Sequence, residues 1–171
     1  PVFFFIVAFI SIFISINADT VSVLVGGNSF KYASFAIMIM ALYPIHQTLG
    51  QFNGTFFLGT SHTKLYSKIG ITFMFIGLPL TYIMIAPLNL FGLNLGSTGL
   101  AIKMVMLNLI GVNVELWFIA KLLNFSFIKM FLMQIKAFVI LVPIAYIGNI
   151  IGDKATDEIF WEFIISGLFY L

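Results

Sequence analysis

The stretch Tyr43-Pro-Ile-His-Gln-Thr-Leu-Gly-Gln-Phe-Asn-Gly-Thr55 decides the fold, because it sets polar side chains inside a long apolar segment, residues 30–58. In a bilayer each of these polar side chains needs a partner or a water-filled path. We therefore expect this segment to be a helix that faces a cavity or another helix. Pro44 is expected to kink it, because proline frees the carbonyl of Met40 from its helical hydrogen bond.

The composition identifies the bilayer as the solvent of the chain. The sequence is 61% hydrophobic and only 8% charged, and 21 residues are Phe. Soluble domains carry about 25% charged residues, so a soluble core is excluded; the mean hydropathy of +1.14 agrees. The lysines are scattered singly and arginine is absent, which leaves no basic footprint for nucleic acid. Without cysteine there is no disulfide or thiolate site, and no metal site, cofactor or nucleotide-binding loop is predicted.

Apolar segments of about 20 residues predict transmembrane helices. We expect an all-α integral membrane protein, a helical bundle of five to six transmembrane helices that forms a single transmembrane domain over residues 1–171. Residues 21–28 are expected to be a short connector, re-entrant or interfacial. Residues 59–68 read as a polar loop and residues 148–158 as the most polar connector. The expected helices cover residues 1–16, 30–58, 69–85, 99–123, 127–147 and 159–171.

Lysine placement predicts the orientation of these helices. Lys64 and Lys68 lie in the polar loop, and Lys121 and Lys129 flank the turn after the fourth helix. Lysines favour the cytoplasmic side, so both loops are expected in the cytoplasm. Lys121 lies near a helix end and is expected to be a snorkelling anchor. The sequence starts and stops within apolar runs, so we expect it to be a fragment of a longer membrane protein.

The second helix carries two neighbouring polar stripes. One stripe recurs at i, i+4, i+8 and i+11 and consists of Tyr43, Gln47, Gln51 and Gly54; the other consists of His46, Gly50 and Asn53. Gly50 and Gly54 also form a G-x-x-x-G pattern, which permits close approach of another helix. The stripes predict either the wall of a translocation cavity or hydrogen bonding at a packed helix interface. His46 is in addition a candidate proton carrier.

The fourth and fifth helices carry the remaining candidates. Asn108, Gly111 and Glu115 lie at i, i+3 and i+7, on one face of the fourth helix. Glu115 is roughly 12 Å from the helix end, a depth at which a carboxyl group is either functional or held as a protonated or lysine-paired structural group. Lys136 lies deep in the fifth helix, where it is expected to pair with Glu115 or to reach an anionic ligand.

Several motifs in this order resemble a known family. The motifs are Tyr43-Pro-Ile-His-Gln-Thr, Gly59-Thr-Ser-His-Thr-Lys64, Gly77-Leu-Pro-Leu-Thr-Tyr, Gly92-Leu-Asn-Leu-Gly-Ser-Thr-Gly-Leu-Ala101 and Leu109-Ile-Gly-Val-Asn-Val-Glu-Leu-Trp-Phe118. Together they resemble the C-terminal half of the polysaccharide flippases, the Wzx-type (O-antigen) members of the multidrug/oligosaccharidyl-lipid/polysaccharide exporter superfamily. The resemblance implies a two-lobed transporter of roughly 12–14 helices, with this chain as its C-terminal lobe and the N-terminal lobe missing.

The resemblance also implies a function. It implies transport of undecaprenyl-diphosphate-linked oligosaccharide across the bacterial inner membrane by alternating access, for O-antigen, lipopolysaccharide or other surface polysaccharide. In this interpretation Gln47, Gln51 and Asn53 bind sugar hydroxyls, and Glu115 or His46 couples transport to protons or sodium. The prolines Pro44, Pro79 and Pro143 would let the helices bend, Pro79 by breaking its helix internally. No enzyme activity is expected.

Other function classes fit the same features. A multidrug or cation antiporter of the same superfamily is the nearest alternative. A membrane polymerase or acyltransferase is a second, although such enzymes carry sizeable polar outer loops and the connectors here are short. A non-catalytic hydrophobic subunit of an energy-transducing complex is a third, and it would also suit short loops and abundant Phe.

Overall fold

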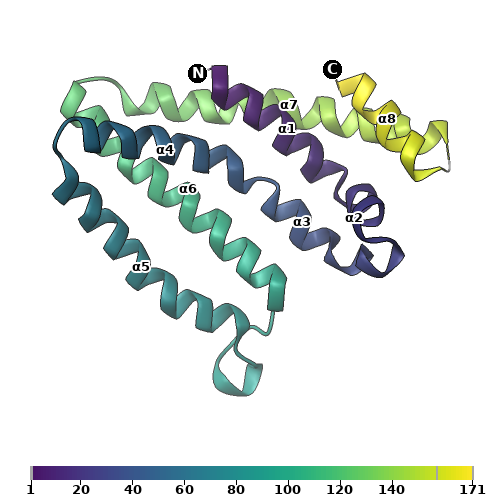
Figure 1. Ribbon diagram of the computed structural model, residues 1–171, viewed down its shortest axis with the longest axis horizontal. Coiled ribbons are helices and arrows are strands. Elements are labelled where there is room, and N and C mark those ends of the chain that lie inside the picture. Colours follow the sequence, from purple (N-terminus) through teal and green to yellow (C-terminus); the bar gives the residue numbers. More distant parts are fainter. Residues whose placement is uncertain (1, 157, 171) are drawn as a thin grey trace. The chain divides into compact units, whose positions relative to one another are not determined.

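The computed structural model describes residues 2–156 and 158–170, so the first residue of the first expected helix and the last residue of the sixth lie outside the described residues. Within that part of the chain the fold is all-helical, which confirms the predicted class. The elements are α1 Val2–Ile16, α2 Ala18–Gly26, the 3-10 helix η1 Asn28–Ala33, α3 Ser34–Met40, α4 Tyr43–Gly59, α5 Thr63–Ile85, the 3-10 helix η2 Leu88–Leu90, α6 Gly96–Leu123, α7 Phe127–Ala155 and α8 Ile159–Tyr170 (Figure 1).

Four helical segments of the described chain are long and apolar enough to cross a membrane. They are Asn28–Gly59, Thr63–Ile85, Gly96–Leu123 and Phe127–Ala155. The pair α1 and α2 passes the same test jointly, but it is bent by 78°, so it is a broken span or a re-entrant loop. The structure thus has four to five candidate spans where five to six were expected. Their length and composition indicate a multi-pass membrane protein.

The contacts within the chain divide it into two compact units. Unit 1 consists of Pro1–Pro44 and Gln134–Leu171, and unit 2 of Ile45–Met133. The sequence predicts a single transmembrane domain, whereas each of these units has its own set of internal contacts. The two units are described separately below.

Unit 2 is built on the pairing of α5 with α6 (Figure 1). A hydrophobic cluster rich in aromatic residues packs beside this pair. Phe57, Ile69 and Ile119 are buried at the centre of the cluster. The Tyr66 ring stacks on Phe57, with centroids 5.6 Å apart. The turn between α4 and α5 is only three residues long and is closed by a backbone hydrogen bond from His62 N to Phe57 O, 2.9 Å. The polar loop expected over residues 59–68 is therefore mostly helix.

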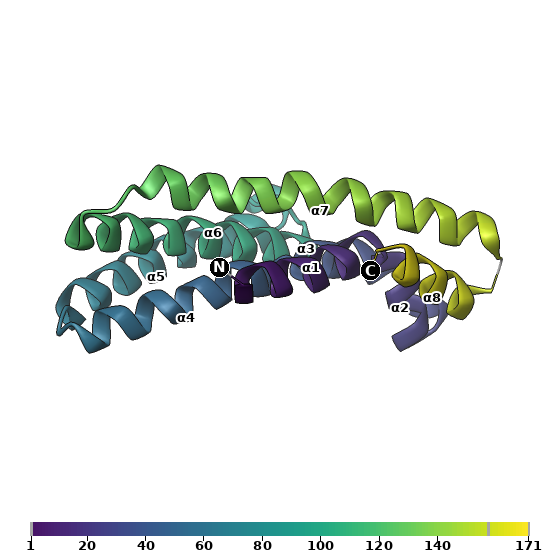
Figure 2. The ribbon, with the colours of Figure 1, turned by 90° about the horizontal axis from the view of Figure 1, so that it is seen from above.

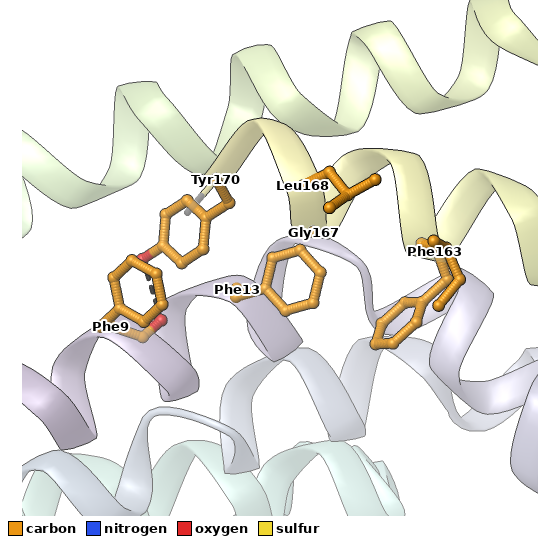
Figure 3. Close-up of a pocket in the computed structure, with 7 residues that line it drawn as sticks. Phe9, Phe13, Phe163, Gly167, Leu168 and Tyr170 are labelled. Atoms are coloured by element: carbon orange, nitrogen blue, oxygen red, sulfur yellow. Dashed lines mark hydrogen bonds between the residues drawn. The ribbon is translucent and has the colours of Figure 1, made fainter.

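Unit 1 gathers α1, α2, α3 and α8, with α2 contacting both α3 and α8 (Figure 2). Aromatic rings fasten α8 to α1. The Tyr170 ring stacks on Phe9 at 4.1 Å and on Phe13 at 5.3 Å between centroids. Its hydroxyl donates a hydrogen bond to Phe9 O, 2.9 Å (Figure 3). The terminal helix is thus anchored by side chains that lie 157 to 161 residues away along the sequence.

Two expected connectors prove to be helical. Most of residues 21–28, expected to be a connector, belongs to α2, which ends where Gly27 takes a φ of 71°. Most of the expected polar connector over residues 148–158 belongs to α7, which runs to Ala155. The re-entrant option for residues 21–28 stays a prediction, since the bent pair α1 and α2 is a broken span or a re-entrant loop. The prediction of a connector over residues 148–158 is wrong, because polar composition does not by itself end a helix. A helix satisfies its backbone groups internally whatever its side chains are.

Prolines affect the helices in two different ways. The helical chain is interrupted at Ala41 and Leu42, directly before α4, whose second residue is Pro44. Proline is tolerated in the first turn of a helix, because a backbone N–H there has no acceptor within the helix. The interruption lies where the sequence predicts a kink. In contrast, α5 continues through Pro79 and α7 through Pro143. The internal break expected at Pro79 is therefore wrong, and a bending role for Pro79 and Pro143 stays a prediction.

Candidate functional site

The structure brings two of the predicted site residues together within unit 2. Asn53 on α4 is buried, and its Nδ2 donates a hydrogen bond to Val112 O on α6, 3.0 Å. The same nitrogen donates to Oε2 of Glu115, 3.3 Å, one turn further along α6. Glu115 is half-buried. We call this set of contacts the Asn53 bridge, because one amide ties two long helices together.

Two glycines allow the approach of neighbouring helices to α4. A Cβ atom added at Gly50 would lie 3.0 Å from Cγ2 of Val112, and one added at Gly54 would lie 2.9 Å from the hydroxyl of Tyr66. The G-x-x-x-G pattern therefore meets two different helices, α6 at Gly50 and α5 at Gly54. Gly111 on α6 is looser, because a Cβ there would be in ordinary contact with Phe73 at 3.7 Å.

The two polar stripes of α4 differ in exposure. His46 and Asn53 are buried, while Gln47 and Gln51 are exposed. The stripe with Asn53 makes the interhelical hydrogen bonds that the packing interpretation calls for. The glutamines present their amides at the surface of unit 2, so the cavity-wall interpretation stays a prediction for them.

Two further predicted site residues, Asn108 and Lys136, are not members of the Asn53 bridge. Asn108 is half-buried on α6. Lys136 is exposed on α7 and belongs to unit 1, whereas Glu115 belongs to unit 2. The expected ion pair between them therefore stays a prediction.

Unit 1 holds a polar cluster that the sequence analysis did not foresee. Asn17 is 1% exposed and lies at the break between α1 and α2. Its Nδ2 donates to Phe13 O, 2.9 Å. Its Oδ1 accepts two hydrogen bonds, from Nδ2 of Asn149 at 3.1 Å and from Oγ of Ser166 at 3.0 Å. We call this cluster the Asn17 network; it joins the helix break to α7 and α8.

A polar pocket adjoins the Asn17 network. The pocket has a volume of about 370 Å³. Thr20, at its wall, donates a hydrogen bond from Oγ1 to Oε1 of Glu162, 2.8 Å. The polar side chains that line the pocket are Asp19, Thr20, Lys31, Asn149, Asp153 and Glu162. These groups can hydrogen-bond a small polar ligand and carry charge of both signs. No group of three or more His, Asp or Glu side chains with metal-binding geometry occurs among the residues that the structure describes.

One short sequence pattern indicates helix packing beside this cluster. Gly148 and Gly152 form a second G-x-x-x-G, on α7. A Cβ at Gly148 would lie 2.9 Å from Ser166 O, and one at Gly152 would lie 2.6 Å from Glu162 O. Such spacing lets a neighbouring backbone approach closely, here that of α8. The pattern would have identified residues 148–152 as a helix-packing face.

Fold and composition define the class of this chain, a multi-pass helical membrane protein with polar clusters inside apolar units. No protein-family model matches the chain, and no curated protein or solved structure matches it.

Proposed function

We propose that this chain is one lobe of a membrane transporter that moves polar cargo by alternating access. The observation that carries the proposal is the interruption of α1–α2 at Asn17, with its 78° bend and buried amide. Asn149, which bonds Asn17, also lines the polar pocket. Interrupted helices with polar groups at the break are the usual building blocks of transporter binding sites. Buried polar groups within an apolar, membrane-spanning chain favour a functional role over a role in helix packing alone.

The proposed cargo is an undecaprenyl-diphosphate-linked oligosaccharide, carried to the outer face of a bacterial inner membrane for O-antigen or other surface polysaccharide. Its support is the resemblance of the motifs in residues 43–118 to the polysaccharide flippases. The exposed amides of Gln47 and Gln51 would bind sugar hydroxyls, and the exposed Lys136 would meet the diphosphate. The proposed role is non-enzymatic and requires no cofactor.

The gene-level test is deletion followed by complementation. Deletion is expected to accumulate lipid-linked repeat units at the cytoplasmic face and to remove surface polysaccharide, and the intact gene is expected to restore both. Normal surface polysaccharide with greater sensitivity to cationic drugs would contradict the flippase and favour drug export. Normal polysaccharide with failed assembly of a respiratory complex would contradict transport and favour a hydrophobic subunit.

The residue-level test compares the two faces of α4. Gln47→Ala with Gln51→Ala is expected to lower transport several-fold at unchanged protein level, because both side chains are exposed and their removal leaves no buried gap. Thr55→Val is the matched control on the same helix, since the Thr55 hydroxyl bonds its own helix at Gln51 O. An equal loss in both variants would argue against a cargo-binding role for the glutamines.

Coupling to an ion gradient is tested at Glu115. Glu115→Gln keeps an oxygen that accepts the hydrogen bond from Asn53, so the fold is expected to keep its stability. The carboxylate is lost, so gradient-driven transport is expected to stop while downhill exchange of cargo continues. Full, gradient-sensitive transport by this variant would move the coupling role away from Glu115.

A further inference from the structure

Two adjoining pockets lie at the end of the α6–α7 hairpin in unit 2. The first, of about 550 Å³, is an apolar groove lined chiefly by Leu109, Ile110, Val114, Trp117, Phe127 and Phe131. The second, of about 450 Å³, lies at the turn and contains Lys121 and Asn124. The pockets share Trp117 and Phe127. An apolar groove therefore passes into a polar site beside a lysine.

The direction of the groove follows from helix geometry. Leu109 and Trp117 are eight residues apart on α6, which corresponds to roughly 12 Å along the helix axis. Lys121 and Asn124 mark the end of α6, where Asn124 takes a left-handed φ of 54°. The groove thus runs from a helix end, where a membrane surface lies, toward the middle of a membrane-spanning helix.

The cation at the polar end is held in place. The Nζ atom of Lys121 lies 3.6 Å from the centroid of the Trp117 ring, a cation–π contact. Within unit 2, residues 116–133 contain two lysines, Lys121 and Lys129, and no acidic residue. No carboxylate in that stretch of sequence competes for the charge of Lys121.

We propose that this composite site binds an anionic phospholipid of the bilayer, with an acyl chain in the groove and the headgroup phosphate at Lys121. Such a lipid fits the site in two ways. Its acyl chain extends from a charged headgroup, as the apolar groove extends from Lys121. Its negative charge also complements the lysines of this part of unit 2. Lysines at a cytoplasmic membrane surface attract anionic lipids. The inference goes beyond the proposed transport function and does not depend on it.

The test uses Trp117 as a reporter, because this residue lines both pockets. Trp161→Phe leaves Trp117 as the sole tryptophan of this sequence. The protein is placed in phosphatidylcholine vesicles that contain a small fraction of lipid with brominated acyl chains, which quench tryptophan on contact. Brominated phosphatidylglycerol is expected to occupy the site with about fivefold preference over brominated phosphatidylcholine, the contribution of one lysine near the surface.

Matched variants assign the preference to the site. Lys121→Gln is expected to abolish the preference, and Lys68→Gln, an exposed lysine on α5 outside both pockets, is expected to retain it. Higher salt is expected to reduce the preference in the parent protein. Equal quenching by the two lipids in the parent, or a preference that survives Lys121→Gln, would overturn the proposal. Both outcomes are readable whether or not the protein transports a lipid-linked sugar.

Discussion

The Asn53 bridge and the Asn17 network both place an asparagine in an apolar interior, but they use its amide differently. Asn53 donates from one nitrogen to two acceptors on α6. Asn17 accepts two hydrogen bonds on its oxygen while its nitrogen bonds the preceding turn. Loss of Asn53 removes a donor from a helix carbonyl and a half-buried carboxylate. Loss of Asn17 leaves two donors without an acceptor. The comparison shows that the free-energy cost of removing a buried asparagine depends on which hydrogen-bonding groups lose their partner.

The largest effect is expected from Asn17→Leu. The change leaves the Asn149 amide and the buried Ser166 hydroxyl without their acceptor. Each unsatisfied buried group costs about 1–3 kcal/mol, so Tm in detergent is expected to fall by roughly 10 °C. The control is Thr72→Val, because the hydroxyl of the exposed Thr72 bonds Lys68 O of its own helix. Similar losses in both variants would refute the special cost assigned to the network.

The second effect concerns the approach of α8 to α7. Gly152→Ala would place a methyl group 2.6 Å from Glu162 O, a backbone atom that cannot turn aside. Overpacking of this kind costs about 1–3 kcal/mol, so a clear fall in Tm is expected. At Gly70 on α5, a Cβ meets no atom within 4 Å, and Gly70→Ala is expected to keep or raise Tm because alanine favours helix. If Gly152→Ala and Gly70→Ala change Tm by the same amount, the close approach of α8 to Gly152 is wrong.

A smaller effect is expected at the Asn53 bridge. Asn53→Leu removes a donor to Glu115 and to Val112 O, with an expected cost of about 1 kcal/mol. A double-mutant cycle with Glu115→Ala isolates the side-chain pair and is expected to give a coupling of about 0.6 kcal/mol, typical of interhelical hydrogen bonds in membranes. Thermal unfolding of the four proteins in one detergent supplies the data. Strict additivity would mean that the 3.3 Å contact contributes nothing to stability.

The smallest effect is expected from Thr20→Val, beside the Asn17 network. The variant keeps the shape of the side chain and loses only the hydrogen bond to Glu162, a cost of about 0.6 kcal/mol. Thr81→Val is the control, since the Thr81 hydroxyl bonds Gly77 O of its own helix. Comparison of the two Tm values measures the tertiary bond alone. A larger fall in Tm for Thr81→Val than for Thr20→Val would contradict a stabilising role for the Thr20–Glu162 hydrogen bond.

The sequence identifies two members of the Asn53 bridge, Asn53 and Glu115, as polar residues on helix faces with glycine. Asn53 shares a helix face with Gly50, and Glu115 shares one with Gly111, so the spacing along each continuous helix shows which residues lie on a common face. The choice of partner was not available from spacing. Within unit 2 the structure records a contact of Glu115 with Asn53, and the pairing of Lys136 with Glu115 or with an anionic ligand stays a prediction.

The Asn17 network was missed for a definite reason. Its members are separated by 132 and 149 residues, and they lie at a helix break, in the last turns of α7 and on α8. No helical period connects such positions. In addition, the polar composition of residues 148–158 predicts a connector, which excludes Asn149 from the predicted helices. The Gly148 and Gly152 spacing was the one local signal for helix packing at this place.

The sequence by itself determined the solvent of this protein, its all-helical class and the approximate positions of its long helices. Those properties are local, because a helix in a bilayer satisfies its backbone hydrogen bonds within its own segment and needs about 20 apolar residues to cross. Only the tertiary structure decided that α1 and α2 meet at a 78° bend and that Asn17 is enclosed there. It also decided that Asn53 is the partner of Glu115. Those outcomes depend on which polar groups come within hydrogen-bonding distance after the helices pack, and distant segments supply them.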